Sequence, residues 1–233
     1  MQPFNFSIRA ALKDSWNTFA KHWGFFIVLA LVLMILNSFT NRGGHPIVMG
    51  IAYVAIIIWT YVLMSVSLAG TDHKDELLNF KSFQLHTPTF RQFFGLIGIV
   101  ITIGVVALVL LAFPLVLFFM AFAQITPVPV WLAALAVPVL VLGAYLLLRS
   151  SFVMISYVDR PISIKAAFKH SWKLTKGKAV LMVLGVAAVS ILLFIGGFIA
   201  LIVGILAAYP LSILLTAHLY RSLTVRESQV STA

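Results

Sequence analysis

Carboxylates and imidazoles, the side chains that most often transfer protons or hold metal ions, are few and scattered in this chain. The 233 residues include six acidic residues and six histidines. No acidic residue falls inside a long apolar run, so a proton relay or a cation pathway through a membrane would lack its usual carboxylate. The acidic residues are Asp14, Asp72, Asp75, Glu76, Asp159 and Glu227.

These residues do not have the spacing of a metal or catalytic site. The sequence has no H-E-x-x-H pattern, and the lack of cysteine excludes thiolate ligands. Asp72, His73, Asp75, Glu76 and His86 could gather a divalent ion, but a solvated loop is the simpler interpretation. We therefore predict no catalytic residue, no cofactor and no bound metal.

The strongest motif is a basic, amphipathic stretch at residues 163–178. It reads S-I-K-A-A-F-K-H-S-W-K-L-T-K-G-K and carries five of the sixteen Lys and Arg residues. Residues 7–16 repeat its first part at a constant offset of 156 positions, with seven of ten residues identical. Each copy precedes a long apolar run, so the chain looks like two related halves around a middle segment.

Both copies are predicted to be amphipathic helices in a membrane interface. A basic residue near an anionic leaflet contributes about 1 kcal/mol of attraction, and aromatic rings prefer the headgroup level. Packing of these helices on the protein itself would explain the same pattern. The predicted headgroup contacts are Arg9, Lys13, Lys21, Lys165, Lys169, Lys173, Lys176 and Lys178, and the predicted interfacial anchors are Trp16, Trp23, Trp172 and Tyr220.

A serine precedes the tryptophan of each copy, at Ser15 and Ser171. A nucleophilic serine needs a positioned base and an oxyanion site, and the sequence places only His170 nearby, in one copy. We therefore expect a structural role for both serines, as small polar residues where an interfacial helix meets the rest of the protein.

The composition requires lipid as the solvent. Hydrophobic residues make up 62% of the chain, charged residues make up 9%, and the mean hydropathy is +1.09. A soluble domain of this length could not bury so much apolar surface. The net charge is +10, but the basic residues fall between apolar runs rather than on one face, which favours a membrane surface over nucleic acid.

Hydropathy predicts an all-α transmembrane helix bundle with about six spans in a single domain. The apolar run at residues 179–220 would be roughly 63 Å long as one helix, twice the thickness of the hydrocarbon core. We expect a turn at Gly196–Gly197, although small residues at every fourth position from Gly196 to Ala208 would also suit a continuous helix. The predicted units are repeat A (7–69), a middle helix pair (94–158), repeat B (163–222) and a short C-terminal tail (223–233).

The charge distribution predicts the topology. Six spans with a cytoplasmic N-terminus place fifteen of the sixteen Lys and Arg residues in the cytoplasm and only Arg42 outside. Both termini are then cytoplasmic, and the duplication is a parallel repeat. A five-span arrangement is the alternative, but it would export Arg221 and Arg226.

Several short matches lie around the second basic stretch. They are V-D-R-P at residues 158–161, A-x-K-x-S-W at residues 167–172 and T-K-G at residues 175–177. With these the chain resembles a bacterial family of six-helix membrane proteins related to the membrane domain of glycerophosphoryl diester phosphodiesterases. The resemblance implies a six-helix fold in the bacterial inner membrane. It does not imply phosphodiesterase activity, because the catalytic domain of such proteins is a separate soluble module that these 233 residues do not contain.

Three functions remain open on the sequence alone. The first is a non-enzymatic inner-membrane protein whose basic helices engage anionic lipid of the cytoplasmic leaflet, in envelope or membrane homeostasis. The second is a small transporter or permease subunit, which the repeat and the prolines within the spans suggest. The third is an enzyme that acts on lipid headgroups. A homo-oligomer or a membrane-protein partner is compatible with all three, and no nucleic-acid partner is expected.

Overall fold

The computed structural model describes residues 6–41, 45–74, 76, 78–80, 85–122, 130–160 and 162–231, and their regular structure is entirely helical. Arg42 and residues 123–129 are among those outside the described part of the chain. In chain order the elements are α1 (Ile8–Lys21), α2 (Trp23–Asn41), α3 (Pro46–Thr71), α4 (Phe90–Ala107), the π-helical η3 (Leu108–Ala112), α5 (Phe113–Phe122), α6 (Val130–Ser150), α7 (Val153–Asp159), α8 (Ile164–Leu174), α9 (Ala179–Ile199) and α10 (Leu201–Ser231).

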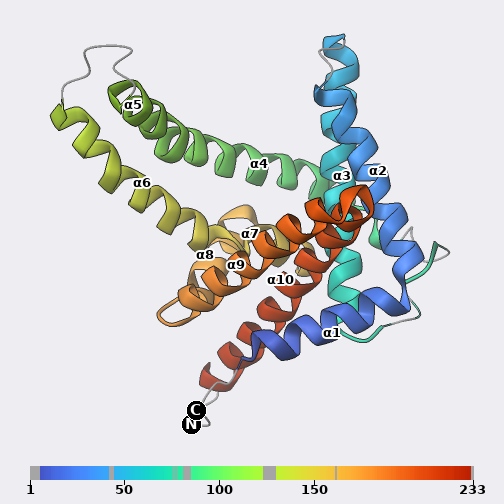
Figure 1. The fold of residues 1–233 in the computed structure, drawn as a ribbon. Coiled ribbons are helices and arrows are strands. Elements are labelled where there is room, and N and C mark those ends of the chain that lie inside the picture. The colour runs from blue at the N-terminus through green and yellow to red at the C-terminus, as the bar shows by residue number, and fades with distance from the viewer. Residues whose placement is uncertain are drawn as a thin grey trace.

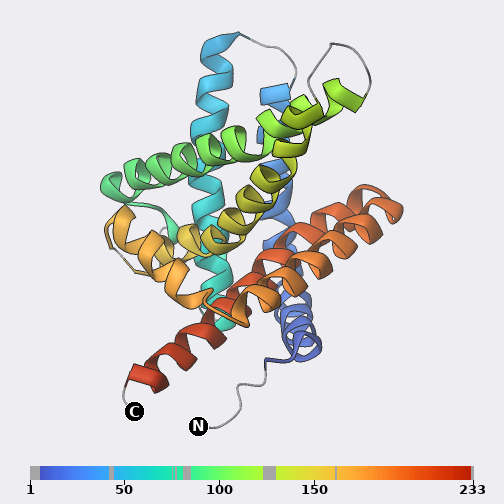
Figure 2. The same ribbon diagram turned by 90° about the vertical axis from the view of Figure 1, so that its left-hand side faces the viewer.

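Three helical hairpins diverge from a common base (Figures 1 and 2). The first hairpin pairs α2 with α3, the second pairs α4, η3 and α5 with α6, and the third pairs α9 with α10. The shorter helices α1, α7 and α8 lie toward the base and contact neighbouring hairpins there. Because the hairpins point in different directions, much of each apolar surface faces outward.

Five helical segments in the described part of the chain are long and apolar enough to cross a membrane. Between 11% and 28% of the most apolar stretch of each one is buried inside the protein. Helices with this much exposed apolar surface need lipid around them, so the structure is compatible with a multi-pass membrane protein. The segments are Trp23–Thr40, Pro46–Thr71, Phe90–Met120, Ala134–Asp159 and Ala179–Ile199.

The second hairpin contains a widened turn directly before Pro114. Proline has no N–H, and its ring crowds the carbonyl group four residues earlier, which here belongs to Leu110. The π-helical turn η3 accommodates this crowding, as such turns do where the regular helical ladder is interrupted. A Cβ on Gly143 of α6 would lie 2.7 Å from the Leu110 carbonyl oxygen, so α6 can approach η3 this closely because residue 143 is glycine.

The helix that begins with α6 breaks between α6 and α7, and Ser171 of α8 satisfies the backbone at the break. The Ser171 hydroxyl donates to the Arg149 carbonyl oxygen at 2.7 Å and accepts from the Phe152 N–H at 3.2 Å. Ser171 is fully buried. It therefore has a structural role, because buried backbone groups without partners would be costly.

The apolar run after residue 178 forms two helices rather than one. α9 ends at Ile199, and α10 packs back along it. A Cβ on Gly197 would lie 2.7 Å from the Gly204 carbonyl oxygen, whereas a Cβ on Gly196 would meet nothing within 4 Å. The close contact at the turn thus depends on Gly197 and Gly204, and the first residue of the predicted ladder, Gly196, takes no part in it.

α10 continues beyond the end of its apolar stretch. Residues 223–231, which are part of the predicted C-terminal tail, form the last turns of this helix. This correction matters for the base of the molecule, because the extra turns carry Arg226 and Glu227 alongside α8. The sequence of these turns is polar, so hydropathy alone marks them as a tail.

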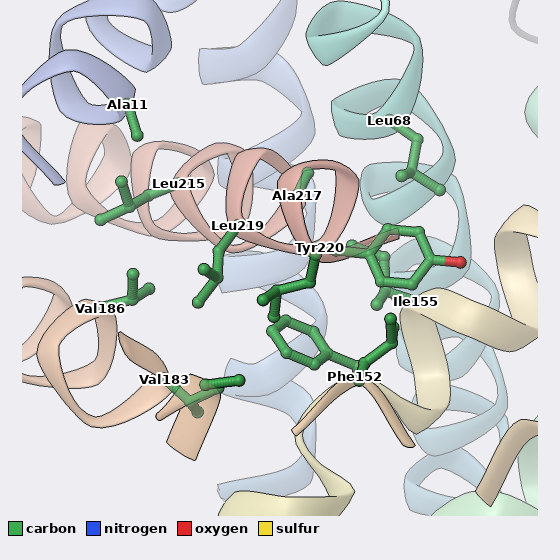
Figure 3. Close-up of a cluster of buried hydrophobic side chains, with 13 residues drawn as sticks. Ala11, Leu68, Phe152, Ile155, Val183, Val186, Leu215, Ala217, Leu219 and Tyr220 are labelled. Carbon is green, nitrogen blue, oxygen red and sulfur yellow. The ribbon is translucent and has the colours of Figure 1, made fainter. Parts of the chain in front are cut away.

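A cluster of buried side chains lies where α10 meets α1, α3, α7 and α9 (Figure 3). The rings of Tyr220 and Phe152 have centroids 5.9 Å apart. Leu219 of α10 and Val183 of α9 belong to the same cluster. α10 is therefore the helix against which most of the base is packed.

Substituting Gly197→Ala should lower the free energy of unfolding by about 1–3 kcal/mol, because the methyl group would collide with the backbone of α10. The neighbouring change Gly196→Ala is the matched control and should be neutral or stabilising by roughly 0.5–1 kcal/mol, since alanine favours helix. Thermal unfolding in detergent micelles, followed by circular dichroism, measures both variants. Equal melting temperatures for the two would contradict the close approach at Gly197.

Candidate functional site at the base of the hairpins

One guanidinium group joins the third hairpin to the end of the first hairpin and to α7, the short helix that follows the second hairpin. Arg221 of α10 donates two hydrogen bonds to the Asp72 carboxylate, from Nε at 2.8 Å and from Nη2 at 2.7 Å. Its Nη1 lies 2.7 Å from an oxygen of Asp159. Asp72 caps the C-terminus of α3, and Asp159 is the last residue of α7. We refer to these three residues as the Arg221 hub.

The hub balances charges that would otherwise be unfavourable. Both carboxylates stand at helix C-termini, where the partial negative charge of the helix disfavours an anion. The side chains of Arg221 and Asp72 are each 27% exposed, and that of Asp159 is 11% exposed, so little water screens the contacts. A bidentate arginine–carboxylate pair in such a setting is among the stronger polar interactions in proteins.

Tyr220 lies inside the protein and not at a lipid-facing surface. The residue is 0% exposed, and its hydroxyl donates a hydrogen bond to Asp159 at 2.9 Å. This corrects the prediction of Tyr220 as an interfacial anchor. The sequence places Tyr220 at the end of an apolar run, where anchors are common, but its side chain turns into the hub instead.

His170 connects α7 and α8 with the last turns of α10. Its Nδ1 lies 3.1 Å from the Ser156 hydroxyl, and its Nε2 lies 3.2 Å from a Glu227 carboxylate oxygen. Lys173 contacts the other oxygen of Glu227 at 2.6 Å. Burial lowers the pKa of His170 from its usual value of 6.5, and the opposing effect of Glu227 does not reverse this shift.

All eight cations predicted to contact lipid headgroups are exposed. Arg9, Lys13 and Lys21 lie on α1, and the remaining five lie on α8 and in the turn that follows it. The predicted anchors Trp16, Trp23 and Trp172 are 55%, 64% and 43% exposed. The structure therefore leaves these cations and rings on the surface, and it does not bring all eight cations into one site.

Trp172 also has a partner within the protein. The Arg149 guanidinium carbon lies 5.3 Å from the centre of a Trp172 ring, and an Arg149 Nη donates to the Trp172 carbonyl oxygen. Arg149 also lies 5.7 Å from the Tyr145 ring. Such cation–π contacts hold an aromatic ring in place beside a charge. α8 is thus attached to the end of α6 by both its serine and its tryptophan.

An apolar groove of about 420 Å³ runs beside α1. Leu12 and Trp16 of α1 line it together with Leu193 of α9 and Leu211 of α10. Arg9 and Lys13 line the same groove, so an apolar surface and two cations stand side by side. The sequence indicated the amphipathic character of α1, but the partner residues of the groove come from helices almost 200 positions away.

A second cavity, of about 450 Å³, lies between the turn after α8 and the last turns of α10. We call it the basic pocket. Its ionisable lining consists of Lys173, Lys176, Lys178, Arg226 and Glu227. Arg226 and Glu227 are not among the predicted site residues, because they fall in the predicted C-terminal tail. Their helical position within α10 was the missing information.

Sequence reasoning also missed the Arg221 hub. Asp72 and Arg221 are 149 positions apart, and Tyr220 and Asp159 are 61 apart. The one available signal was that Asp72, Asp159 and Arg221 each follow a long apolar run, at the end predicted to be cytoplasmic. Charges at equivalent membrane depths can meet, but hydropathy does not say which helix ends are neighbours.

Two of the residues that could gather a divalent ion have other polar partners. Asp72 is held by Arg221, and His86 lies 2.8 Å from the Ser65 hydroxyl, whereas Asp75 is outside the described residues. In the part of the chain that the structure describes, no three His, Asp or Glu side chains gather closely enough to hold a metal ion.

Replacing Arg221→Gln should lower the free energy of unfolding by roughly 2–4 kcal/mol, because two partly buried carboxylates would lose their cation. Arg221→Lys should restore only part of this stability, since an ammonium group cannot bind Asp72 through two parallel bonds while reaching Asp159. Arg160→Gln is the control: Arg160 is 49% exposed and lies 3.6 Å from the same Asp159, and such pairs contribute about 0–1 kcal/mol. Equal losses of melting temperature at positions 221 and 160 would contradict the hub.

The pKa of His170 predicts a loss of stability in mild acid. Because the folded pKa lies below the unfolded value of 6.5, the unfolded chain binds more protons as the pH falls below about 6.5. The pH values 7.5 and 5.5 lie on either side of the unfolded pKa of 6.5. Between them, the melting temperature of the wild type should fall more steeply than that of His170→Asn. Parallel curves for the two proteins would rule out a contribution from His170.

Comparison of the chain with protein-family models, with curated proteins and with solved structures gives no match.

Proposed function

We propose that this chain is a non-enzymatic, multi-pass inner-membrane protein that holds anionic phospholipid at its cytoplasmic face, in support of membrane homeostasis. The observation that carries the proposal is the groove beside α1. There Arg9 and Lys13 stand next to an apolar surface that includes Trp16 and Leu193. A phospholipid has the complementary arrangement, a phosphate joined to acyl chains, so the cations would bind the phosphate while a chain lies along the groove.

The second basic helix supports the same function. Lys165 and Lys169 of α8 are exposed, and Trp172 is 43% exposed beside them. Each basic residue near an anionic leaflet adds about 1 kcal/mol of attraction. α1 and α8 lie at different places around the base, so together they would contact lipid on more than one side of the protein (Figure 2).

A six-span topology with cytoplasmic termini is part of the proposal. Five of the spans are the long apolar segments, and the first part of α10 would be the sixth. The position of the cations supports this orientation, because α1, α8 and the polar end of α10 all lie at the base, away from the turns of the hairpins. Cytoplasmic ends of membrane helices are enriched in Lys and Arg.

A parallel repeat is the proposed origin of the two basic helices. α1 and α8 begin at Ser7 and Ser163, and each serine hydroxyl accepts a hydrogen bond at 3.3 Å from the N–H three residues later. Each helix is followed by an apolar hairpin. This common order supports the repeat, and it fits the resemblance of residues 158–178 to the six-helix family of bacterial membrane proteins.

An enzyme acting on lipid headgroups is the second candidate, because the basic pocket brings five ionisable side chains together. The composition of its lining favours binding over catalysis. Its one carboxylate, Glu227, is engaged by Lys173, and its described lining has no serine, threonine, cysteine or histidine that could attack an ester. A headgroup held there would meet cations and two leucines, which recognise it without transforming it.

The double variant Arg9→Glu with Lys13→Glu should weaken binding of phosphatidylglycerol by roughly tenfold or more, at about 1 kcal/mol for each cation. Native mass spectrometry of the detergent-purified chain, titrated with this lipid, measures the effect. The charge-preserving pair Arg9→Lys with Lys13→Arg is the control and should bind as the wild type does. Unchanged binding in the charge-reversed variant, or equal binding of phosphatidylcholine, would sink the proposal.

A further inference from the structure

The basic pocket is separate from the α1 groove and shares no lining residue with it. α8 and the turn after it contribute Lys173, Lys176 and Lys178, and α10 contributes Arg226 and Glu227. Four cations and one carboxylate therefore surround a space of about 450 Å³. The repulsion between these like charges raises the electrostatic free energy of the protein, and a bound counter-ion would lower it.

We propose that the basic pocket is a binding site for a phosphate ester, either the headgroup of an anionic phospholipid or a free phosphate compound. The Lys173 ammonium lies 2.6 Å from Glu227, which neutralises the one carboxylate of the lining. Lys176 and Lys178 then make the electrostatic potential of the pocket positive, and lysine is a common ligand of phosphate. The lipid form of this proposal rests on the proposed function and adds a defined headgroup site to it.

Gly177 positions two of these cations around the pocket. Its φ of 65° lies in the left-handed region, which side chains disfavour, so glycine suits this tight turn between Lys176 and Lys178. A Cβ on Gly177 would meet nothing within 4 Å, and the residue lines the pocket. Its backbone is thus open to a ligand, as in turns that let phosphate approach the main chain.

The pocket also has an apolar wall, which points to an ester with an organic substituent. Leu174 and Leu223 line it, and they are 5% and 2% exposed. The volume is also several times that of a water molecule, which occupies about 30 Å³, so a phosphate with an attached glycerol group fits. A glycerol phosphate headgroup combines the charge and the carbon surface that this lining offers.

The experiment uses the full chain in detergent with two probes, sn-glycerol 3-phosphate and phosphatidylglycerol. The pocket variant is Lys176→Gln with Lys178→Gln, and the control is Lys74→Gln with Arg91→Gln, which removes the same charge from exposed positions outside the pocket, α1 and α8. Isothermal titration calorimetry measures the affinity for sn-glycerol 3-phosphate, and native mass spectrometry measures the binding of phosphatidylglycerol. All four side chains are exposed, so melting temperatures should stay near that of the wild type.

We expect the pocket variant to lose about tenfold in affinity for at least one probe, and the control to change by about twofold or less. A loss with sn-glycerol 3-phosphate assigns the pocket to free phosphate esters, and a loss with phosphatidylglycerol alone assigns it to the lipid headgroup. Equal losses in the pocket and control variants, or no loss with either probe, would overturn the proposal. If Arg9→Glu with Lys13→Glu still loses phosphatidylglycerol in that case, the proposed function survives and only the pocket assignment fails.

Discussion

The arrangement of the hairpins depends on the contact of Arg221 with Asp72 and Asp159. In lipid, apolar helices gain little by leaving the acyl chains for one another, because the chains are as apolar as leucine. The hairpins accordingly diverge and keep long apolar sides exposed. At the base, charged side chains would be unfavourable in these apolar surroundings without partners. Ion pairing therefore determines which helix ends lie next to one another. The guanidinium has enough donors to satisfy two carboxylates from two different hairpins.

α10 is the helix through which these ion pairs form. It carries Arg221 and Tyr220 in the hub, and its leucines fill the cluster that also contains Phe152. The same helix lines both proposed ligand surfaces, through Leu211 in the groove beside α1 and through Arg226 in the basic pocket. α10 therefore carries side chains that hold the base together and also contributes to the lining of both proposed ligand surfaces. A lipid at either surface would contact the structural centre of the protein.

The helical class and the main breaks were predictable because they follow from local physics. Apolar runs of limited length predict the long helices, and the run after residue 178 is too long for one span. The structure confirms that this run forms two helices, but the predicted position of the turn is wrong, because Gly196 and Gly197 lie within α9 and the turn is at Ala200. The close packing next to the turn involves Gly197 and Gly204. The break before α7 was not predicted. It depends on the Ser171 hydroxyl, which comes from another helix and has no counterpart in the sequence around the break.

The sequence by itself determined that this chain is helical, apolar and basic between its apolar runs, since composition and spacing act along the chain. Only the tertiary structure decided which charges meet. Tyr220 looks like an interfacial anchor from its neighbours in sequence, yet Asp159 draws its hydroxyl inward. Glu227 looks like part of a tail, yet α10 carries it to Lys173 and to the pocket. Ion pairing depends on distance in space, and the helix crossings that set those distances are not encoded in any local pattern.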